Sequence, residues 1–478
     1  MIKLKNNINQ KINEVKLAQI LFCIFPLSFL VGNLLVTINL LLLVVIALII
    51  VKKEQLKFRF KNSYWLLIFF FIYIILLTVI QFQSPGLLYE VTKSWEFKSN
   101  PTYKSFFLLR FLVLVFVLDM LFTNKILKLN NFFLISLICT SFVSFDVILQ
   151  YLTGFDLFGY KSSDSPPRNP GPFGDEWISG SYLQKFSFFS FFYIIEIYKN
   201  AKLKNTLLIS IITLHLTGLL LAGNRMPFIL FMFACALIVL LIKKLRFIMS
   251  LSLIISLGII FLIMKNDPKI ENYYLNILDK TLNRINFSKI LETGKINEDI
   301  LIREKKSATT YHPGAAFLRT TGHGAIYRTA IKLWKEQPLF GHGLKSFRVK
   351  CWKILEKGEK HLAKGESMSG GGASNLACST HAHNYYLELL VEVGIIGTGL
   401  MIIFFIILLK DSYYFLKKYN QKIDSEMALI MPFVIVIFLE IWPLKSSGSF
   451  FTTWEATFFW LAVAMLISAK SQTEKYHS

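Results

Sequence analysis

Long apolar stretches separated by short polar segments dominate the chain. Stretches long enough to span a bilayer lie at about 17–32, 33–51, 63–82, 104–122, 131–152, 181–198, 206–222, 227–242, 247–264, 391–409, 427–443 and 454–469. We divide the first two at Gly32–Asn33 because their continuous apolar run is too long for one span. The pattern predicts an all-α polytopic membrane protein with about twelve transmembrane helices.

The basic residues predict how these helices are oriented. Lys and Arg cluster at 3–16, 52–61, 125–128, 199–204, 243–246 and 410–422. All of these clusters lie on one side of the membrane if both termini are cytoplasmic. The outer segments would then be 83–103, 153–180, 223–226 and 265–390. We therefore expect an N-terminal bundle of helices 1–9 (1–264), a large, partly helical outer loop before helix 10 (265–390), and helices 10–12 with a cytoplasmic tail (391–478).

Within the large loop, apolar residues recur at helical spacing. Ile326, Ala330, Leu333 and Trp334 predict an amphipathic helix over 324–336 that ends before Pro338. The Gly-His-Gly at 341–343 predicts a turn, and the Gly- and Ser-rich residues 364–375 predict a flexible connector.

The net charge and the N-terminal sequence bear on nucleic acid binding and on secretion. The 52 Lys and Arg against 30 Asp and Glu give a net charge of +22, which in a soluble protein would suggest nucleic acid. Here the basic clusters lie between apolar runs and set topology, so no nucleic acid partner is expected. The basic start leads into a hydrophobic pair without a small-residue cleavage site, so it is not typical of a signal peptide.

The five cysteines divide into two groups. Cys23, Cys139 and Cys235 lie in apolar runs, where cysteines usually pack. Cys351 and Cys378 lie in the polar region, and they could form a disulfide if that region is extracytoplasmic.

His383 is the leading catalytic candidate. It lies where the polar region gives way to a membrane helix, beside His381 and Asn384, with Glu388 one turn further on. A neutral imidazole there could accept a proton from an attacking hydroxyl, although a lone histidine at a membrane rim is more often structural. His381 and His383 would also suit a metal, but no further His or carboxylate follows at a ligand-like spacing, so no metal site is expected.

Charged residues in the outer segments are candidates for substrate binding. Arg225 lies in a Gly-Asn-Arg-Met-Pro turn between two predicted membrane helices, where a charge is costly and marks either a site or a side chain that snorkels to the headgroups. In the Pro- and Gly-rich loop 153–180, Arg168, Asp175 and Glu176 could contact polar substrate groups or form an internal salt bridge.

The predicted loop helix adds Arg319, His323, Arg328, Lys332 and Lys335. An arginine there could bind a phosphate bidentately, whereas the lysines are typical of a solvated helix face. The ionisable residues recognised inside apolar stretches are scattered and form no proton path, which weighs against a transporter.

Four stretches together resemble a known family. They are His383-Asn384 followed by Gly394-Ile-Ile-Gly397; residues 171–176 with 180–183; Gly223-Asn224-Arg225; and residues 334–343. With the predicted topology, they resemble the O-antigen ligase and polymerase family, glycosyltransferases at the periplasmic face of the bacterial inner membrane.

The resemblance implies a donor glycan on undecaprenyl diphosphate and an acceptor sugar hydroxyl, typically on lipid A-core, with a hydrophobic groove for the polyprenyl tail. His383 would be the base and Arg225 one of two arginines that hold the diphosphate, without metal or cofactor. Many members carry Ser-Gly-Arg where this chain has Thr321-Gly322-His323. The second cation could therefore be His323, Arg319 or Arg328. An O-antigen polymerase is the nearest alternative, and a flippase or channel for the same lipid is a second.

Overall fold

The computed structural model describes residues 2–54, 56, 60–82, 100–164, 166–282, 322–358, 376–421 and 425–475. Over these residues the protein is almost entirely α-helical. The sheet in this part of the chain is one short antiparallel hairpin, β1 (Ser163–Asp164) and β2 (Pro167–Arg168). The predicted all-α class is therefore confirmed.

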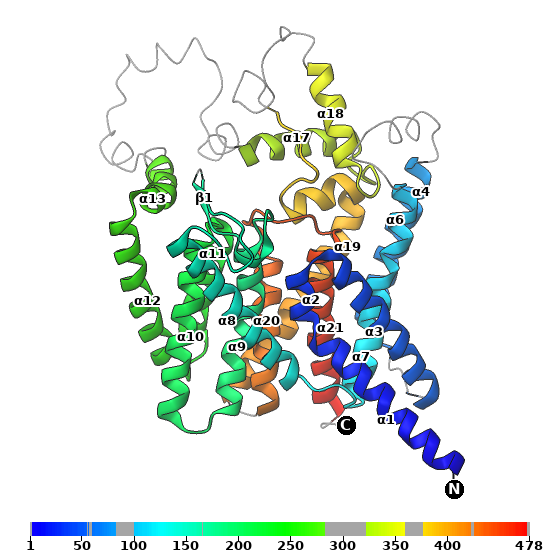
Figure 1. Cartoon of the computed structure of the whole chain (residues 1–478). Helices are drawn as coiled ribbons and strands as arrows, with labels where there is room; N and C mark the ends of the chain where they lie inside the picture. Colours follow the sequence, from blue (N-terminus) through cyan, green and yellow to red (C-terminus); the bar gives the residue numbers. More distant parts are fainter. Residues whose placement is uncertain are drawn as a thin grey trace.

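The helices follow the predicted apolar stretches closely (Figure 1). The first half of the chain forms α1 (Ile2–Cys23), α2 (Phe25–Val31), α3 (Asn33–Glu54), α4 (Asn62–Phe82), α6 (Pro101–Phe107), α7 (Leu109–Thr123), α8 (Asn130–Thr153), the 3-10 turn η1 (Gly171–Phe173), α9 (Ser179–Ile197), α10 (Ala201–Leu221) and α11 (Arg225–Leu241). The second half forms α12 (Arg246–Asn266), α13 (Pro268–Leu282), α17 (Gly322–Glu336), α18 (Phe347–Gly358), α19 (Tyr385–Gln421), α20 (Ser425–Glu440) and α21 (Thr453–Lys475). Each of the twelve predicted stretches lies, to within a few residues, inside one of these helices or a consecutive pair, although α1 begins well before residue 17 and α19 ends well after residue 409.

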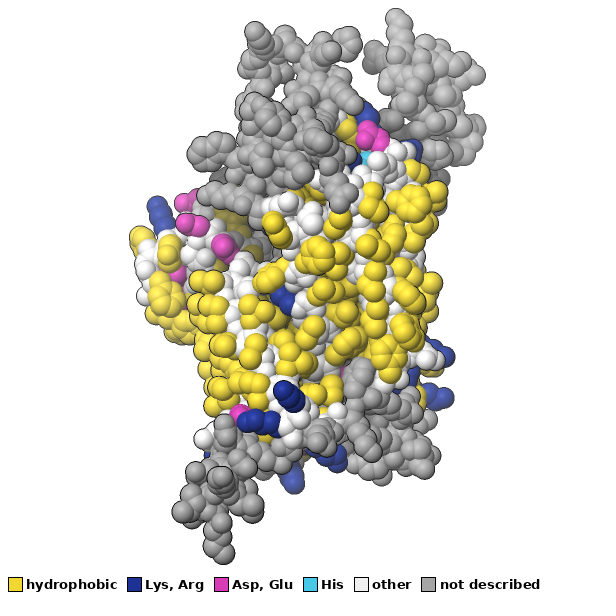
Figure 2. Space-filling view, turned by 90° about the vertical axis from the view of Figure 1, so that its right-hand side faces the viewer, with side chains coloured by type: hydrophobic (Ala, Val, Ile, Leu, Met, Phe, Trp, Pro, Cys, Tyr) yellow, Lys and Arg dark blue, Asp and Glu magenta, His cyan; other side chains and the backbone are white. Residues whose placement is uncertain are grey.

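Seven helices among the described residues are long and apolar enough to cross a membrane, or eight if the pair α1–α2, bent by 50°, is one span. They are α3, α4, α6 with α7, α8, α10, α12 and α19, while α11 and α20 are apolar but shorter. Hydrophobic side chains cover most of the middle of one face, and Lys and Arg gather along its lower edge (Figure 2). The exact number of twelve spans stays a prediction.

The two ends of the chain lie at the same end of the helical body (Figure 1). The hairpin β1–β2, α13, α17 and α18 lie at the opposite end. The assignment of these ends to cytoplasm and periplasm, and the division of the chain at 264 and 390, stay predictions.

One apolar core joins the N-terminal helices to α19–α21. Aromatic rings connect its parts: Phe29 of α2 contacts Phe186 of α9 and Trp454 of α21, each at a centroid distance of 5.3 Å. A second, smaller core consists of Ala330, Leu333, Phe347, Cys351, Ile354, Ala382 and Val391. Because this small core includes Ala382, it fixes the histidine-bearing segment to α17, α18 and α19.

Two predictions for the large loop are confirmed. The helix expected over 324–336 is α17, which ends at Glu336, before Pro338. The turn at 341–343 has positive φ at both Gly341 and Gly343. The connector predicted at 364–375 lies outside the described residues.

Helix 10 begins earlier than its predicted apolar stretch. We expected it at 391, but α19 begins at Tyr385. The reason is that Glu388 and Glu392, whose charges lower the local hydropathy, are buried inside the bundle. Burial of these two side chains lets the helix continue at its N-terminal end through a stretch that looks polar in sequence.

Candidate functional site

The glycines of the His383–Gly397 stretch build a break in α19. At Gly394 the backbone leaves helical geometry, with φ 62° and ψ −169°. Loop 338–343 lies against this break and forms hydrogen bonds with it, from Ile395 N–H to the Pro338 carbonyl and from the Gly343 N–H to the Glu392 carbonyl, both 2.9 Å. The loop thus replaces hydrogen bonds that the broken helix cannot make internally.

Only glycine fits at the two contact points of this junction. A Cβ on Gly394 would lie 2.3 Å from the Leu339 carbonyl oxygen, and one on Gly341 would lie 2.4 Å from the Gly394 nitrogen. Both glycines also have positive φ, which side chains disfavour. The glycines of this motif therefore have a structural role, because they let the loop dock directly on α19.

Asn384 connects the histidine segment to two other elements. Its side-chain oxygen accepts hydrogen bonds from the N–H groups of Tyr386 and Leu387, so it caps α19. Its amide nitrogen donates to two carbonyl oxygens in the α20–α21 loop, residues 441–452. As a result His383, with a strained φ of 53°, is held at a defined place directly before the helix.

Three histidines meet at this place. The His383 ring centroid is 4.1 Å from that of His381 and 4.8 Å from that of His323, at the start of α17. The Ser379 hydroxyl is 3.0 Å from Nε2 of His383. Sequence analysis named all three histidines, but it missed Ser379, because a serine in a polar segment gives no distinguishing signal.

The backbone of the segment is fixed as well. The His383 carbonyl accepts hydrogen bonds from the Ser447 N–H (3.0 Å) and the Tyr327 hydroxyl (3.3 Å). In His381, Nε2 lies 3.2 Å from the Ser447 carbonyl and Nδ1 lies 3.1 Å from the Thr380 hydroxyl. Both ring nitrogens of His381 therefore have partners within the protein, which makes it a positioning residue.

Burial, together with the neighbouring His381 and His323 rings, lowers the pKa of His383 to about 3. Burial likewise lowers the pKa of His381. Both imidazoles are then neutral at neutral pH, the form that can accept a proton. An anionic substrate close to His383 would favour the protonated form and make the imidazole a better base.

Beneath the histidines lies a buried charged network. Lys185 of α9 forms ion pairs with Glu440 and Glu455, and Lys445 forms one with Glu440. The Tyr385 hydroxyl donates to both carboxylates. Sequence analysis overlooked this network, although Lys185 and Glu440 are charges within predicted spans, which is a recognisable signal.

Glu388 adds a second connection to the α20–α21 loop. Its carboxylate accepts hydrogen bonds from the Ser449 hydroxyl (2.5 Å) and the Phe450 N–H (2.7 Å). Lys345 donates to the same Ser449 hydroxyl, at 2.8 Å. Glu388 therefore has a structural role in the described structure.

Cys351 and Cys378 are bonded, with Cα atoms 5.6 Å apart. The bond joins α18 to the segment that leads to His383. The pairing considered from the sequence is thus present in the structure.

A second group of predicted residues assembles around Gly223. Its φ is +71°, and a Cβ there would lie 2.5 Å from the Pro167 carbonyl oxygen, so glycine lets strand β2 pack against the turn. Asn224 accepts a hydrogen bond from the Gly180 N–H and donates one to the Trp177 carbonyl. Loop 153–180 and the Gly-Asn-Arg turn therefore form one structure.

This packing brings Arg168 and Arg225 to the same tyrosine. The Arg225 Cζ lies 3.6 Å from the centroid of the Tyr273 ring, and its Nη2 donates to the Tyr273 carbonyl oxygen. Arg168 donates to the Tyr273 hydroxyl at 3.4 Å and stacks on Trp177, with Cζ 4.2 Å from the ring centroid. Tyr273 and Trp177 were not predicted, because aromatic residues are common at such interfaces.

Two of the remaining candidates, Asp175 and Glu176, are brought to neither group by the contacts of the described residues. Asp175 and Glu176 are exposed, and no ion pair involves them within the described part of the chain. Arg328 is partly buried on α17, and Arg319 lies outside the described residues. Among the residues that the structure describes, no group of three or more His, Cys, Asp or Glu is arranged to hold a metal ion.

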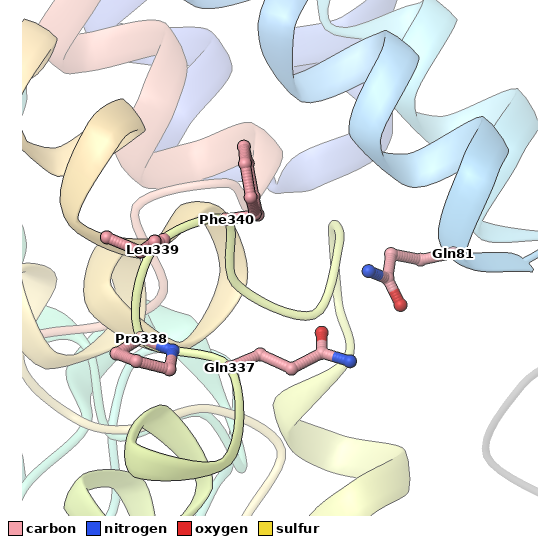
Figure 3. A pocket seen from close by; sticks show the side chains of 5 residues that line it. All are labelled: Gln81, Gln337, Pro338, Leu339 and Phe340. Atoms are coloured by element: carbon pink, nitrogen blue, oxygen red, sulfur yellow. The ribbon is translucent and has the colours of Figure 1, made fainter.

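Two cavities lie near these groups. One of about 320 Å³ is lined by Gln81, Gln337, Pro338, Leu339 and Phe340, beside the junction with α19 (Figure 3). The side-chain amides of Gln81 and Gln337 point toward each other across it. The other, of about 210 Å³, lies between the hairpin, α10 and α13 and is lined by Arg168 and Tyr273 among others.

Comparison with known proteins identifies part of the chain. Residues 208–402 match a family model described as O-antigen ligase. The match includes Arg225, His323, His383 and both glycines of the α19 junction, but not Arg168. No curated protein matches the chain. The match over residues 208–402 supports the resemblance to the O-antigen ligase family that the sequence motifs indicated.

Proposed function

We propose that this protein is an O-antigen ligase-type glycosyltransferase. It moves a glycan from undecaprenyl diphosphate to a sugar hydroxyl of lipid A-core, at the periplasmic face of the bacterial inner membrane. The observation that carries this proposal is the neutral His383, clustered with His381 and His323 at the start of α19. The family match over the same segment supports it.

In this reaction the acceptor hydroxyl oxygen attacks the anomeric carbon of the donor glycan. His383 accepts the hydroxyl proton as the new glycosidic bond forms. The bond between the anomeric carbon and the diphosphate oxygen breaks, and undecaprenyl diphosphate leaves with the electron pair. Arg225 stabilises the charge that builds up on the leaving diphosphate, so no step needs a metal or cofactor.

A polymerase reaction is the second candidate. It would use the same donor, base and arginine but would transfer the glycan to a second lipid-linked glycan. A flippase for the same lipid would not need the proton acceptor at all, and it should therefore tolerate His383→Ala.

A transfer assay in proteoliposomes tests these possibilities. Purified wild type and His383→Ala would each receive a lipid-diphosphate glycan and lipid A-core. Glycan on lipid A-core, reduced by about 10²–10⁴-fold in the variant, supports the ligase. Longer lipid-linked glycans would assign the protein to the polymerases. Lipid translocation by both proteins without any transfer would sink the catalytic proposal.

His381→Gln is the matched variant for this assay. It changes a neighbouring histidine whose two ring nitrogens already have partners in the protein. We expect a smaller loss of transfer than in His383→Ala, because the substitution disturbs the position of the base but leaves the base itself. An equal loss would assign the proton transfer to the histidine pair and not to His383 alone.

A further inference from the structure

We propose that Ser379 is a positioning residue that fixes the proton of the neutral His383 ring on Nε2 and leaves Nδ1 as the nitrogen that accepts a proton. The use of that nitrogen as a base rests on the proposed function. The tautomer itself is a property of the protein without substrate, so it can be measured independently of glycan transfer. Ser379 takes no proton from the substrate and acts through the imidazole alone.

The first argument concerns the two ring nitrogens of His383. The Ser379 hydroxyl lies 3.0 Å from Nε2. Within the described part of the chain, Nδ1 has no hydrogen-bond partner. In the neighbouring His381, by contrast, both ring nitrogens have partners. Of these two histidines, His383 is therefore the one that keeps a nitrogen available for a substrate.

The second argument decides the direction of the hydrogen bond. If the Ser379 hydroxyl donated to Nε2, the proton of the neutral ring would lie on Nδ1, and neither nitrogen could accept a proton from a substrate. If Nε2–H donates to the hydroxyl oxygen, Nδ1 carries a free lone pair, because the bond made by one ring nitrogen sets the state of the other. Only the second arrangement agrees with a base at His383. The same Nε2–H bond also persists when the ring is protonated.

The third argument is that the backbone around Ser379 is anchored. Cys378, the residue before it, is bonded to Cys351 of α18. One residue further back, the Ala377 N–H donates to the Thr329 hydroxyl of α17 at 3.1 Å. The Ser379 hydroxyl is therefore held at a defined place by two elements that do not belong to its own segment.

The backbone of His383 is fixed from the other side. Its carbonyl accepts hydrogen bonds from the Ser447 N–H and the Tyr327 hydroxyl, at 3.0 and 3.3 Å. Two neighbouring histidine rings pack against its own ring. These contacts restrict the rotation of the ring, but they do not distinguish its two nitrogens. Ser379 distinguishes them, because its hydroxyl bonds to one of the two.

Solid-state NMR of the ¹⁵N-histidine-labelled full chain in phosphatidylcholine nanodiscs tests the proposal. At pH 7.5 His383 is neutral, since burial lowers its pKa. The ¹⁵N chemical shifts show which ring nitrogen carries the proton, and a His383→Gln spectrum identifies the His383 signals among the eight histidines. We expect the wild-type proton on Nε2 alone. Ser379→Ala should show both tautomers, because no hydrogen bond then favours one. A wild-type proton on Nδ1, or an unchanged tautomer in Ser379→Ala, would overturn the proposal.

Two matched variants exclude a general loosening of the segment. Thr380→Val removes the neighbouring hydroxyl, which lies against His381 and not against His383, so the His383 signals should stay as in wild type. Ser379→Thr keeps the hydroxyl and should restore the single tautomer. Mixed tautomers in either variant, as in Ser379→Ala, would overturn the proposal. Unchanged signals of His215, which is buried in α10, would show that each variant is folded.

Transfer activity separates this proposal from the proposed function. In proteoliposomes, Ser379→Ala should lower kcat by about three- to tenfold, as loss of one hydrogen bond to the base should, and change KM by less than about twofold. Ser379→Thr should recover most of kcat. Wild-type kcat in Ser379→Ala would overturn the positioning role. If Ser379 sets the tautomer but wild type transfers no glycan, the tautomer assignment stands and the proposed function fails.

Discussion

Segment 376–384, which carries His381 and His383, and the hairpin that carries Arg168 differ in how their polar groups are satisfied. Around the histidines, side chains bridge several elements: Asn384 caps α19 and bonds to the α20–α21 loop, and Glu388 bonds to the same loop. A disulfide attaches the segment to α18. At the hairpin, the two arginines share one tyrosine, and each keeps an unpartnered Nε.

This difference corresponds to two roles. The histidine segment holds a proton acceptor in place, whereas the arginines keep donors available for a charged ligand. A proton acceptor must be held within a fraction of an ångström of its productive place, and a satisfied network does this. A group that binds a charged ligand must keep donors available, at a cost in the free protein. The two regions therefore predict different responses to substitution: loss of stability around the histidines and loss of ligand affinity at the arginines.

The largest effect on stability should come from Glu440→Gln. The carboxylate of Glu440 is buried between Lys185 and Lys445, and its loss leaves Lys445 without an ion-pair partner. Breaking a buried pair of this kind costs about 3–5 kcal/mol, which equilibrium unfolding in mixed micelles would measure. Lys269→Gln, which breaks the exposed pair with Asp164, should leave the unfolding midpoint unchanged. An equal loss of unfolding free energy in both variants would contradict the expected difference between the buried network and the exposed Lys269–Asp164 pair.

The disulfide should have the next largest effect. Replacing both Cys351 and Cys378 with serine removes a crosslink across a sequence separation of 27. It should lower the free energy of unfolding by about 3 kcal/mol. A reductant should lower the unfolding midpoint of wild type and leave that of the double variant unchanged. Affinity for inorganic pyrophosphate, which stands in for the donor diphosphate, should stay the same in both, since the hairpin does not contact this crosslink. Joined Cys351 and Cys378 peptides in non-reducing mass spectrometry would verify the bond independently.

Gly223→Ala tests the hairpin side of the comparison. The left-handed conformation costs a side chain about 1–2 kcal/mol, and the new Cβ would push strand β2 away from the turn. Pyrophosphate affinity should fall, because Arg168 and Arg225 would separate. Gly399→Ala, at a helical position with no atom within 4 Å of the added Cβ, is the control and should be neutral or slightly stabilising. Unchanged affinity in Gly223→Ala would show that the close packing is not needed for binding.

The smallest effect concerns pH. With its pKa lowered to about 3, His383 stays neutral when the pH falls from 7.5 to 5.5. Over that range kcat/KM for transfer should be nearly constant, whereas protonation of a base with the ordinary pKa of about 6.5 would reduce it about tenfold at pH 5.5. His323→Gln removes one neighbouring ring that lowers the pKa of His383. In this variant the fall of kcat/KM at acid pH should therefore begin at a higher pH than in wild type. A limb near pH 6.5 in wild type would contradict the burial of the base.

Periodicity and local chemistry predicted much of the fold. The apolar stretches coincide with helices, and the division at Gly32–Asn33 matches the end of α2 at Val31 and the start of α3 at Asn33. Helix α17 and the turn at 341–343 follow from helical spacing and glycine. These features could be predicted because they depend on contacts between residues close in sequence.

The early start of α19 and the buried network of Lys185 with Glu440 could not be predicted in this way. Both depend on partners far away in the sequence. Glu388 accepts hydrogen bonds from Ser449 and Phe450, 61 and 62 residues later, and Lys185 pairs with Glu440, 255 residues later. These partners satisfy charges that would otherwise exclude the segments from a bilayer. Hydropathy scores each residue alone, so it treats a paired charge and an unpaired one alike.

The sequence by itself determined the membrane class, the helical segments and the residue types of the candidate site, His383 and Arg225 first among them. Only the tertiary structure decided which of these residues meet. It placed His323 beside His383, it bonded Asn384 to the α20–α21 loop, and it brought Arg168 and Arg225 to Tyr273. The physical reason is that contacts between residues far apart in the sequence depend on how helices and loops pack together, and no local pattern in the chain records that packing.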